Sequence, residues 1–346
     1  MASTLKSETI QNASSATANL TLDTSGNVTV GNTLAMGSSF LRNRIINGDM
    51  SVYQRGSVAA TTSGAYTLDR WFVTPTGATV TVTQSTTTIP TGFADSLNVA
   101  GAASVTNVSV RQRIESVNTQ DLASGVIVTV SGRIYQSTGS AVTTATIALA
   151  APTALDNYTS TTSAATTYTI PSIANATWVQ FSNTFTLTAS CVNGLQVTIA
   201  LGTGLTTGSF NLTGVQLEVG SVATPFERRQ HGQELALCQR YYYRITSSVT
   251  NGSLGTGNNG STTQANIFTQ FPVNMRTAPT AVEQTGTAAD YQVNSVVCSA
   301  VPVFSAVTDV WGALTTLTVA SGLTAGQCVR GLTTSSGKYL GWSAEL

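Results

Sequence analysis

The sequence has little charge, and the charge it has is balanced. Its 346 residues include 15 basic and 15 acidic side chains, so the formal net charge at pH 7 is zero. No group of neighbouring cations is larger than the pair Arg228 and Arg229. A protein that binds DNA or RNA needs clustered cations to displace the counterions of the phosphates. We therefore expect no nucleic-acid partner.

Long apolar runs are also missing. No stretch approaches the roughly 20 apolar residues that cross a bilayer, and the first residues lack the apolar core of a signal peptide. We expect no membrane insertion, and synthesis in a cytoplasm without a signal peptide.

Residues that hold metals or perform catalysis are scarce. The four cysteines lie far apart and form no Cys-x-x-Cys motif, so we expect mostly buried free thiols and neither a metal nor a cofactor. The single histidine, His231, has no Gly-x-Ser-x-Gly or His-Glu-x-x-His motif around it. We expect no enzyme, although 15 acidic residues leave open a carboxylate pair for glycoside cleavage.

What the sequence does contain is β-branched residues in alternation with polar ones. Such side chains pack well on a pleated sheet, and a period of two places every second residue in the core. The pattern recurs at residues 79–83, 108–114, 126–130 and 195–199, with turn residues between. It predicts an all-β fold built on an antiparallel jelly-roll sandwich.

The pattern divides the chain into four predicted segments. Residues 40–228 form the jelly-roll sandwich, residues 229–240 a short linking helix, and residues 241–346 a smaller distal β-sandwich whose last residues are held in place. In residues 1–39, two short alternating runs flank a turn at 23–27, which predicts a hairpin in a β-stalk segment. A disordered tail is the alternative, because so short a hairpin is marginal alone.

The few charges gather in one place. Six of them, from Arg42 to Arg70, fall within 29 residues around the stretch Arg-Ile-Ile-Asn-Gly-Asp-Met-Ser-Val-Tyr-Gln-Arg-Gly at 44–56. Charges that cluster in a chain this neutral are expected to be paired with one another, bound to a ligand or placed at a structural corner.

Several motifs of this chain closely resemble those of a phage and prophage tail-fibre family. They are NRIINGDMSVYQRG (43–56), YTLDRWFV (66–73), TGVQLEVGSVATPFERR (213–229), LALCQRYYYR (235–244) and FPVNMRTAPT (271–280). The resemblance covers roughly residues 40–280. The N-terminal 39 residues resemble the β-stalks of trimeric fibres more weakly.

The resemblance implies a virion protein made in the host cytoplasm. It implies a homotrimer in a tail appendage, attached at residues 1–39 to a tail or baseplate protein and binding a glycan of the bacterial surface through the distal domain. The alternative is a head fibre or capsid decoration protein that binds no receptor. An enzyme that depolymerises surface polysaccharide is a third reading.

The jelly roll of that family is similar to carbohydrate-binding modules, which implies a role for the Asn-Gly-Asp turn. In such modules this turn helps to bind a structural calcium, which here would recruit Asp49 and Glu218. Calcium prefers six to eight oxygens, and two carboxylates supply too few, so we favour ion pairs with arginines. The residues expected to form structural pairs at a corner or a subunit seam are Arg44, Asp49, Asp69, Arg70, Glu218 and Arg228.

An aromatic residue among polar loop residues is a suitable platform for a sugar. Trp311 follows Asp309 closely and precedes Gly312, which predicts a loop or a strand end. Loops at the ends of a sandwich tend to carry binding residues. We therefore predict Trp311, Asp309 and Tyr291 as ligand-binding residues.

Overall fold

The computed structural model describes residues 9–10, 20–22, 28–30 and 42–346. The chain divides into two compact units, Met1–Leu41 and Arg42–Leu346. In the first unit, the strands form one antiparallel sheet in the order β1-β2-β3, with bounds β1 (Thr9–Ile10), β2 (Leu20–Leu22) and β3 (Val28–Val30). The predicted hairpin of β2 and β3 is confirmed by its register. The remainder of the predicted stalk lies outside the described residues.

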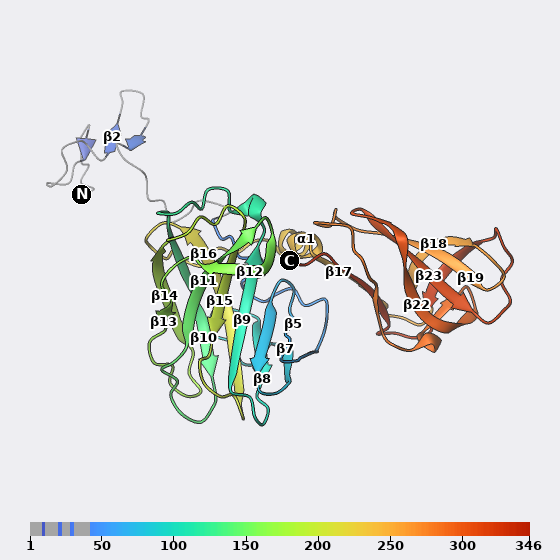
Figure 1. The fold of residues 1–346 in the computed structure, drawn as a ribbon, viewed down its shortest axis with the longest axis horizontal. Helices are drawn as coiled ribbons and strands as arrows, with labels where there is room; N and C mark the ends of the chain where they lie inside the picture. Colours follow the sequence, from blue (N-terminus) through green and yellow to red (C-terminus); the bar gives the residue numbers. More distant parts are fainter. Residues whose placement is uncertain (1–8, 11–19, 23–27, 31–41) are drawn as a thin grey trace, which may run out of the picture. The chain divides into compact units, whose positions relative to one another are not determined.

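The second unit begins with a sandwich of two antiparallel sheets (Figure 1). One sheet has the order β14-β10-β16-β8-β7-β4, and the other has the order β12-β11-β15-β9-β6-β5 with β13 paired to β11. The bounds are β4 (Val58–Ala60), β5 (Ala65–Tyr66), β6 (Phe72–Thr76), β7 (Val80–Ser85), β8 (Ser96–Ala100), β9 (Asn107–Ile114), β10 (Ile127–Gln136), β11 (Thr146–Ala154), β12 (Asn157–Ser163), β13 (Tyr168–Thr169), β14 (Val179–Thr186), β15 (Leu195–Ala200) and β16 (Ser209–Val219), with a 3-10 turn η1 at Ser116–Asn118.

Alternation along these strands produces the core. In β9 every second residue is buried, from Val108 to Ile114, and β15 alternates in the same way. Because both strands belong to one sheet, their buried faces meet the inner face of the other sheet and form one continuous core. The predicted all-β jelly-roll class is confirmed.

Strand β16 contains a bulge that matters for what lies beside it. Its pairing with β10 shifts between Ser131, which is opposite Gln216, and Arg133, which is opposite Thr213. Two residues of β16, Gly214 and Val215, therefore lie opposite the single residue Gly132 of β10. Gly214 has a φ of 63°, a left-handed conformation that glycine adopts freely. The bulge leaves part of β16 free to pair elsewhere.

The predicted linking helix is confirmed as α1 (His231–Gln239). Beyond it, β18, β19, β23, β22, β21 and β24 close into a barrel, and β17, β25 and β20 form a separate three-stranded sheet (Figure 1). The bounds are β17 (Tyr242–Thr246), β18 (Ser253–Asn259), β19 (Gln264–Gln270), β20 (Glu283–Gln284), β21 (Tyr291–Val293), β22 (Val296–Asp309), β23 (Gly312–Val319), β24 (Cys328–Thr333) and β25 (Tyr339–Ser343), with a 3-10 turn η2 at Ala288–Asp290.

The distal part is thus a small barrel with a flanking sheet, where the sequence pattern suggested a second sandwich. The reason lies in β22, whose pairing with β23 shifts register at three places along its 14 residues. Such irregularities bend a strand and increase its twist, so the sheet curls until its edges meet. Alternation alone does not distinguish a closed sheet from two packed ones.

Candidate functional site

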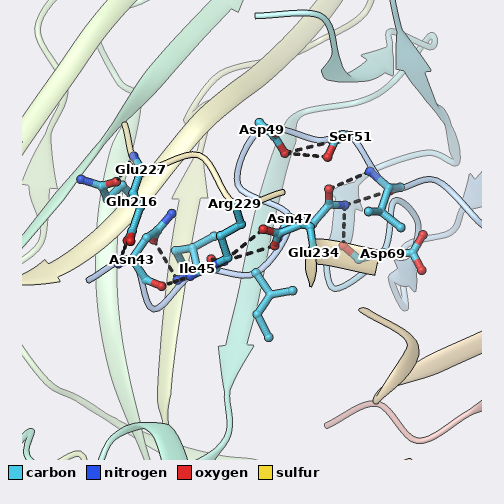
Figure 2. Close-up of polar contacts among 12 residues, drawn as sticks. Asn43, Ile45, Asn47, Asp49, Ser51, Asp69, Gln216, Glu227, Arg229 and Glu234 are labelled. Atoms are coloured by element: carbon cyan, nitrogen blue, oxygen red, sulfur yellow. Dashed lines mark hydrogen bonds and ion pairs between the residues drawn. The ribbon is translucent and has the colours of Figure 1, made fainter. Parts of the chain in front are cut away.

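The Asn-Gly-Asp turn is a densely bonded structural corner (Figure 2). The Asn47 side chain accepts a hydrogen bond from the N–H of Val52 at 2.9 Å and donates to the carbonyls of Val52 at 2.8 Å and Asp69 at 3.0 Å. The main-chain carbonyl of Asn47 accepts a hydrogen bond from the Trp71 indole at 2.8 Å, and its main-chain N–H donates to the Glu234 carboxylate on α1. One buried asparagine thus ties its own turn to the Asp69–Trp71 turn and to the helix.

Close contact with the β16 bulge explains why residue 48 is a glycine. The N–H of Val215, in the β16 bulge, donates to the carbonyl of Gly48 at 2.9 Å. A Cβ atom at position 48 would lie 2.2 Å from the Val215 carbonyl oxygen, far inside contact distance. The corner therefore packs directly against the main chain of the bulge. We call Asn43–Val52 the corner.

The start of the corner is fastened to the segment that leads into the helix. The Asn43 amide oxygen accepts the N–H groups of Ile45 at 2.9 Å and Leu217 at 3.1 Å. The buried Arg229 guanidinium donates to the Ile45 carbonyl at 3.0 Å and forms an ion pair with Glu234 at 3.2 Å (Figure 2). These bonds fix where the helix leaves the sandwich.

A second buried cluster, which we call the Glu345 cluster, joins the sandwich to the distal part. The Glu345 side chain, 4% exposed, pairs with Arg70, which is 1% exposed, and with Arg55 at 3.5 Å. The Arg70 guanidinium lies 3.6 Å from the ring centre of Tyr241, and Arg55 lies 3.4 Å from that of Tyr242. Burial is the largest influence on the pKa of Arg70 and lowers it, but the Glu345 carboxylate, together with Tyr241, Tyr66 and Cys238, raises the pKa above its usual value, so the guanidinium stays charged.

The residues beside Glu345 are held in the same way, as the sequence analysis expected. The Tyr66 hydroxyl donates to the main-chain oxygen of Leu346 at 2.6 Å, and Arg113 donates to the same atom. Arg276 donates to the carbonyl of Ala344 at 2.9 Å. Main-chain oxygens of this segment thus serve as acceptors for both the sandwich and the distal part.

Glu115 makes a further link. Its carboxylate receives two donors of the Arg240 guanidinium, the closest at 2.9 Å, and the Tyr241 hydroxyl at 2.8 Å. Burial raises the pKa of Tyr241 to about 12, so its hydroxyl stays protonated and donates. The end of α1 and the residue before β17 are thereby fixed to the sandwich.

Asp69 is buried, and no arginine among the described residues forms an ion pair with it. Its carboxylate accepts the N–H and the side-chain amide of Gln54, at 2.7 and 2.6 Å. Burial raises its pKa, and the nearby charge of Arg55 and the Gln54 hydrogen bonds oppose the rise only in part. The expected ion pair at Asp69 is replaced by amide donors, because Arg70 is directed to Glu345.

Two of the other predicted structural residues form ion pairs. Arg44 pairs with the exposed Asp121 at 2.7 Å. The buried Glu218 lies 3.8 Å from Arg42 and accepts the N–H and hydroxyl of Thr224 at 2.9 and 2.8 Å. Whether these residues also meet a neighbouring subunit stays a prediction.

Asp49 and Arg228 differ from what the sequence suggested. Among the ion pairs of the described residues none includes Asp49, whose carboxylate instead accepts the Ser51 hydroxyl at 2.9 Å. This local bond competes with a distant arginine, so the predicted pair is corrected. Arg228 donates to the Gly92 carbonyl and lies over the Phe93 ring. In residues 42–346, no group of three His, Cys, Asp or Glu side chains is arranged to hold a metal ion.

Of the predicted ligand-binding residues, two lie together at the surface. Asp309 and Gly312 pair across the end of the β22–β23 hairpin, so Val310 and Trp311 form its two-residue turn. Trp311 is 52% exposed and rests on Phe268, with ring centres 5.3 Å apart. Asp309 is also exposed and accepts the N–H of Val310 at 2.6 Å. The arrangement presents an aromatic face with a carboxylate beside it.

Tyr291 must be removed from that set. It is fully buried, and its hydroxyl donates to the Tyr339 carbonyl at 2.7 Å while accepting the Thr285 N–H at 2.9 Å. It begins β21, whereas Trp311 follows the far end of the 14-residue β22. All three residues of β21 are buried, and Tyr291 belongs to the hydrophobic core of the distal part.

Glu345 and Glu115 were not among the residues predicted from the sequence, although their buried carboxylates link the sandwich to the distal part. Glutamates are few in this chain, so their positions carry information. Each sits where a strand has just ended, with Ile114 closing β9 and Ser343 closing β25. That signal is visible in the sequence, but the arginine partners, up to 290 residues away, are not.

Comparison with known proteins assigns no family. No protein-family model matches the sequence, and no curated protein matches it. No helix of the described residues is long and apolar enough to cross a membrane.

Some solved structures are similar to about half of this chain. They include the enzymatically active domain of tailspike protein 4 of bacteriophage CBA120, with a TM-score of 0.35 and 15% identity over 51% of this chain and 21% of that one. A xylan-binding domain from Paenibacillus barcinonensis has a TM-score of 0.30 and 13% identity over 52% and 96%. A carbohydrate-binding module in complex with β-1,4-galactotriose has a TM-score of 0.31 and 11% identity over 52% and 99%. Because these TM-scores are below 0.5, we derive neither a ligand nor an activity from them.

Proposed function

We propose that this protein is a virion fibre that attaches a phage to its bacterial host by binding a surface glycan through the distal barrel. The resemblance of several motifs to the tail-fibre family supports the proposal, and in the structure these motifs supply the corner and the arginines of the Glu345 cluster. As in that family, we propose a homotrimer held at residues 1–39 by a tail or baseplate protein.

The observation that carries the glycan-binding role is the exposed Trp311. A large aromatic side chain that is half exposed at a hairpin turn is not explained by the core. Its ring offers an apolar face to the C–H side of a sugar, while the adjacent Asp309 carboxylate can accept hydrogen bonds from hydroxyl groups. Phe268 packs against the indole, and a side chain that is already held in place loses less entropy on binding.

A single such platform is a weak site, and a trimer compensates for this. Three copies on one fibre convert later binding events into intramolecular ones, so avidity exceeds the affinity of each site. We propose a binding protein and not an enzyme. The buried carboxylates of Glu115, Glu218 and Glu345 are each occupied by arginine, hydroxyl or main-chain donors, which favours a structural role for them.

The test combines location and binding. Immunogold electron microscopy of intact virions, with antibody against residues 241–346, should label the far ends of tail appendages. Label over the head would overturn the proposal and favour a decoration protein. The purified full chain should bind host cells and block phage adsorption, and Trp311→Ala should lose at least about tenfold in affinity, the usual effect of removing an aromatic anchor. Val303→Ala, which removes another exposed apolar side chain of the barrel, should not.

A further inference from the structure

The sandwich carries a groove of about 300 Å³ that has no part in the attachment role proposed for the barrel. It lies on the outer face of the sheet that contains β10, β14 and β16. Ser131 and Arg133 point outward there because they alternate with Val130 and Ile134, which belong to the core. We use the name groove for the space lined by Phe93, Ser131, Arg133, Gln180, Phe226 and Arg228 with their neighbours.

Two phenylalanines from different loops form its aromatic wall. The ring centres of Phe93 and Phe226 are 5.4 Å apart, with the ring planes inclined at 59°. Phe93 sits over the main chain of the β16 bulge, where a Cβ atom on Gly214 would lie 2.6 Å from the ring. The bulge and its glycine therefore make the space that the ring occupies.

Two arginines lie beside this wall, and neither has a counter-ion among the described residues. The Arg228 guanidinium lies 4.7 Å from the ring centre of Phe93 and 5.6 Å from that of Phe226, and the Arg133 guanidinium lies 5.7 Å from Phe93. Among the described residues, neither arginine forms an ion pair with a carboxylate. Arg228 donates to a main-chain carbonyl, and Arg133 has no hydrogen bond of its guanidinium within residues 42–346.

This arrangement differs from that of the arginines that pair with carboxylates. Arg44, Arg55, Arg70, Arg229 and Arg240 all pair with carboxylates. Arg111 and Arg113 likewise share one ring, that of Phe72, but their guanidinium groups donate to Thr74 and to the main-chain oxygen of Leu346. Two like charges that share one ring repel each other, and an anion placed between them relieves the repulsion. A guanidinium binds a carboxylate through two parallel hydrogen bonds and stacks on an aromatic ring at the same time. The groove is therefore complementary to a small ligand that has both an apolar face and a carboxylate.

We propose that the groove binds an acidic saccharide, a sugar ring that carries a carboxylate. The C–H face of the ring packs on Phe93 and Phe226, and the carboxylate bridges Arg133 and Arg228. The exposed Gln180, opposite Arg133 on β14, provides amide groups for ring hydroxyls. The volume is at the lower end of the range of about 300–1,000 Å³ for small-molecule sites, which suits one or two sugar units.

Calorimetric titration of the full chain tests this. The probes are short oligosaccharides of galacturonic, glucuronic and N-acetylneuraminic acid, with galactotriose as the neutral comparison. At least one acidic probe should bind, more weakly as salt is added, while galactotriose should not bind at this site. Arg133→Gln and Arg228→Gln should each lower the affinity at least about tenfold, as for the loss of a charge-assisted hydrogen-bonded pair. Phe93→Leu should also lower it.

Two control variants separate this groove from other sites. Arg330→Gln removes an arginine from the barrel, and Trp311→Ala removes the proposed receptor platform, and both should leave acidic-probe binding unchanged. Circular dichroism and melting curves confirm that each variant is folded. Absence of binding by all acidic probes, equal binding of galactotriose, or unchanged affinity of both arginine variants would each overturn the proposal. Loss of binding in Trp311→Ala would assign the acidic sugar to the barrel instead.

Discussion

The arginines of the Glu345 cluster and those of the groove have the same chemistry but opposite surroundings. Arg55 and Arg70 are almost fully buried, share one carboxylate and stack on tyrosines. Arg133 and Arg228 also stack on aromatic rings, yet lie nearer to solvent and have no carboxylate partner among the described residues. Solvent is what permits the second arrangement, because a buried cation without an anion costs several kcal/mol.

In a chain with so few charges, the burial and pairing of an arginine indicate whether it has a structural role or a binding role. A buried arginine that pairs with a carboxylate indicates a structural link between two parts of the fold, since its charge is already neutralised and its geometry is fixed. An accessible, unpaired arginine beside aromatic rings indicates a surface that can accept an anion. The following predictions test this distinction, from the largest expected effect to the smallest.

Glu345→Gln should weaken the link that the Glu345 cluster makes between the sandwich and the distal part. It leaves Arg70 and Arg55 buried without an anion, and removing one partner of a buried pair typically costs about 3–5 kcal/mol. The loss should appear as a lower urea midpoint for the transition that separates or unfolds the distal part. Asp121→Asn, which removes the carboxylate of an exposed pair, should cost less than about 1 kcal/mol. Equal losses for the two variants would refute the distinction.

Asp69→Asn should change how stability depends on pH. Burial raises the pKa of Asp69 above its ordinary value of 3.8, so the folded protein favours the protonated acid. The contribution of Asp69 to stability is therefore fully present below pH 3.8 and is lost as the pH rises through the folded pKa. The unfolding free energy of the variant, minus that of the wild type, should increase as the pH rises through this window. A constant or falling difference would contradict the assignment.

The double variant Arg133→Gln, Arg228→Gln should leave stability within about 0.5 kcal/mol of the wild type, because accessible charges away from buried networks contribute little. Thermal unfolding at low and high salt measures this. A small gain at low salt would fit the relief of repulsion between the two guanidinium groups. A loss as large as that of Glu345→Gln would show that the groove is structural and would remove the contrast.

The strands could be predicted from sequence because alternation is local. The period of two in β9 and β15 reports directly which face is buried, and the helix formers around His231 stand out from their surroundings. Six charges crowd residues 42–70 in a neutral chain, and this predicts a structural corner there, but the pairs that were expected at Asp49 and Asp69 did not form.

The partners could not be predicted in the same way. Glu345 meets Arg70 across 275 residues, and only the folded topology brings the two together. In the sequence, Tyr291 and Trp311 are both aromatic residues near predicted loops. The fold buries Tyr291 in the core of the distal part and leaves Trp311 exposed at a turn. The groove depends on a bulge at Gly214 and on two separate loops, none of which has a sequence signature of its own.

Both ends of the distal part are fastened to the sandwich, and this has a mechanical consequence. Its first strand, β17, follows the helix, its last strand, β25, leads to Glu345, and the two strands pair with each other. Because these two attachments lie on neighbouring strands, we expect the distal part to move less freely relative to the sandwich than it would on a single linker. In the fibre that we propose, a pulling force would be shared between the covalent chain and the ion pairs of the Glu345 cluster. Under rising force we expect the ion pairs to yield first, after which the barrel would trail from the helix alone as a flexible tether.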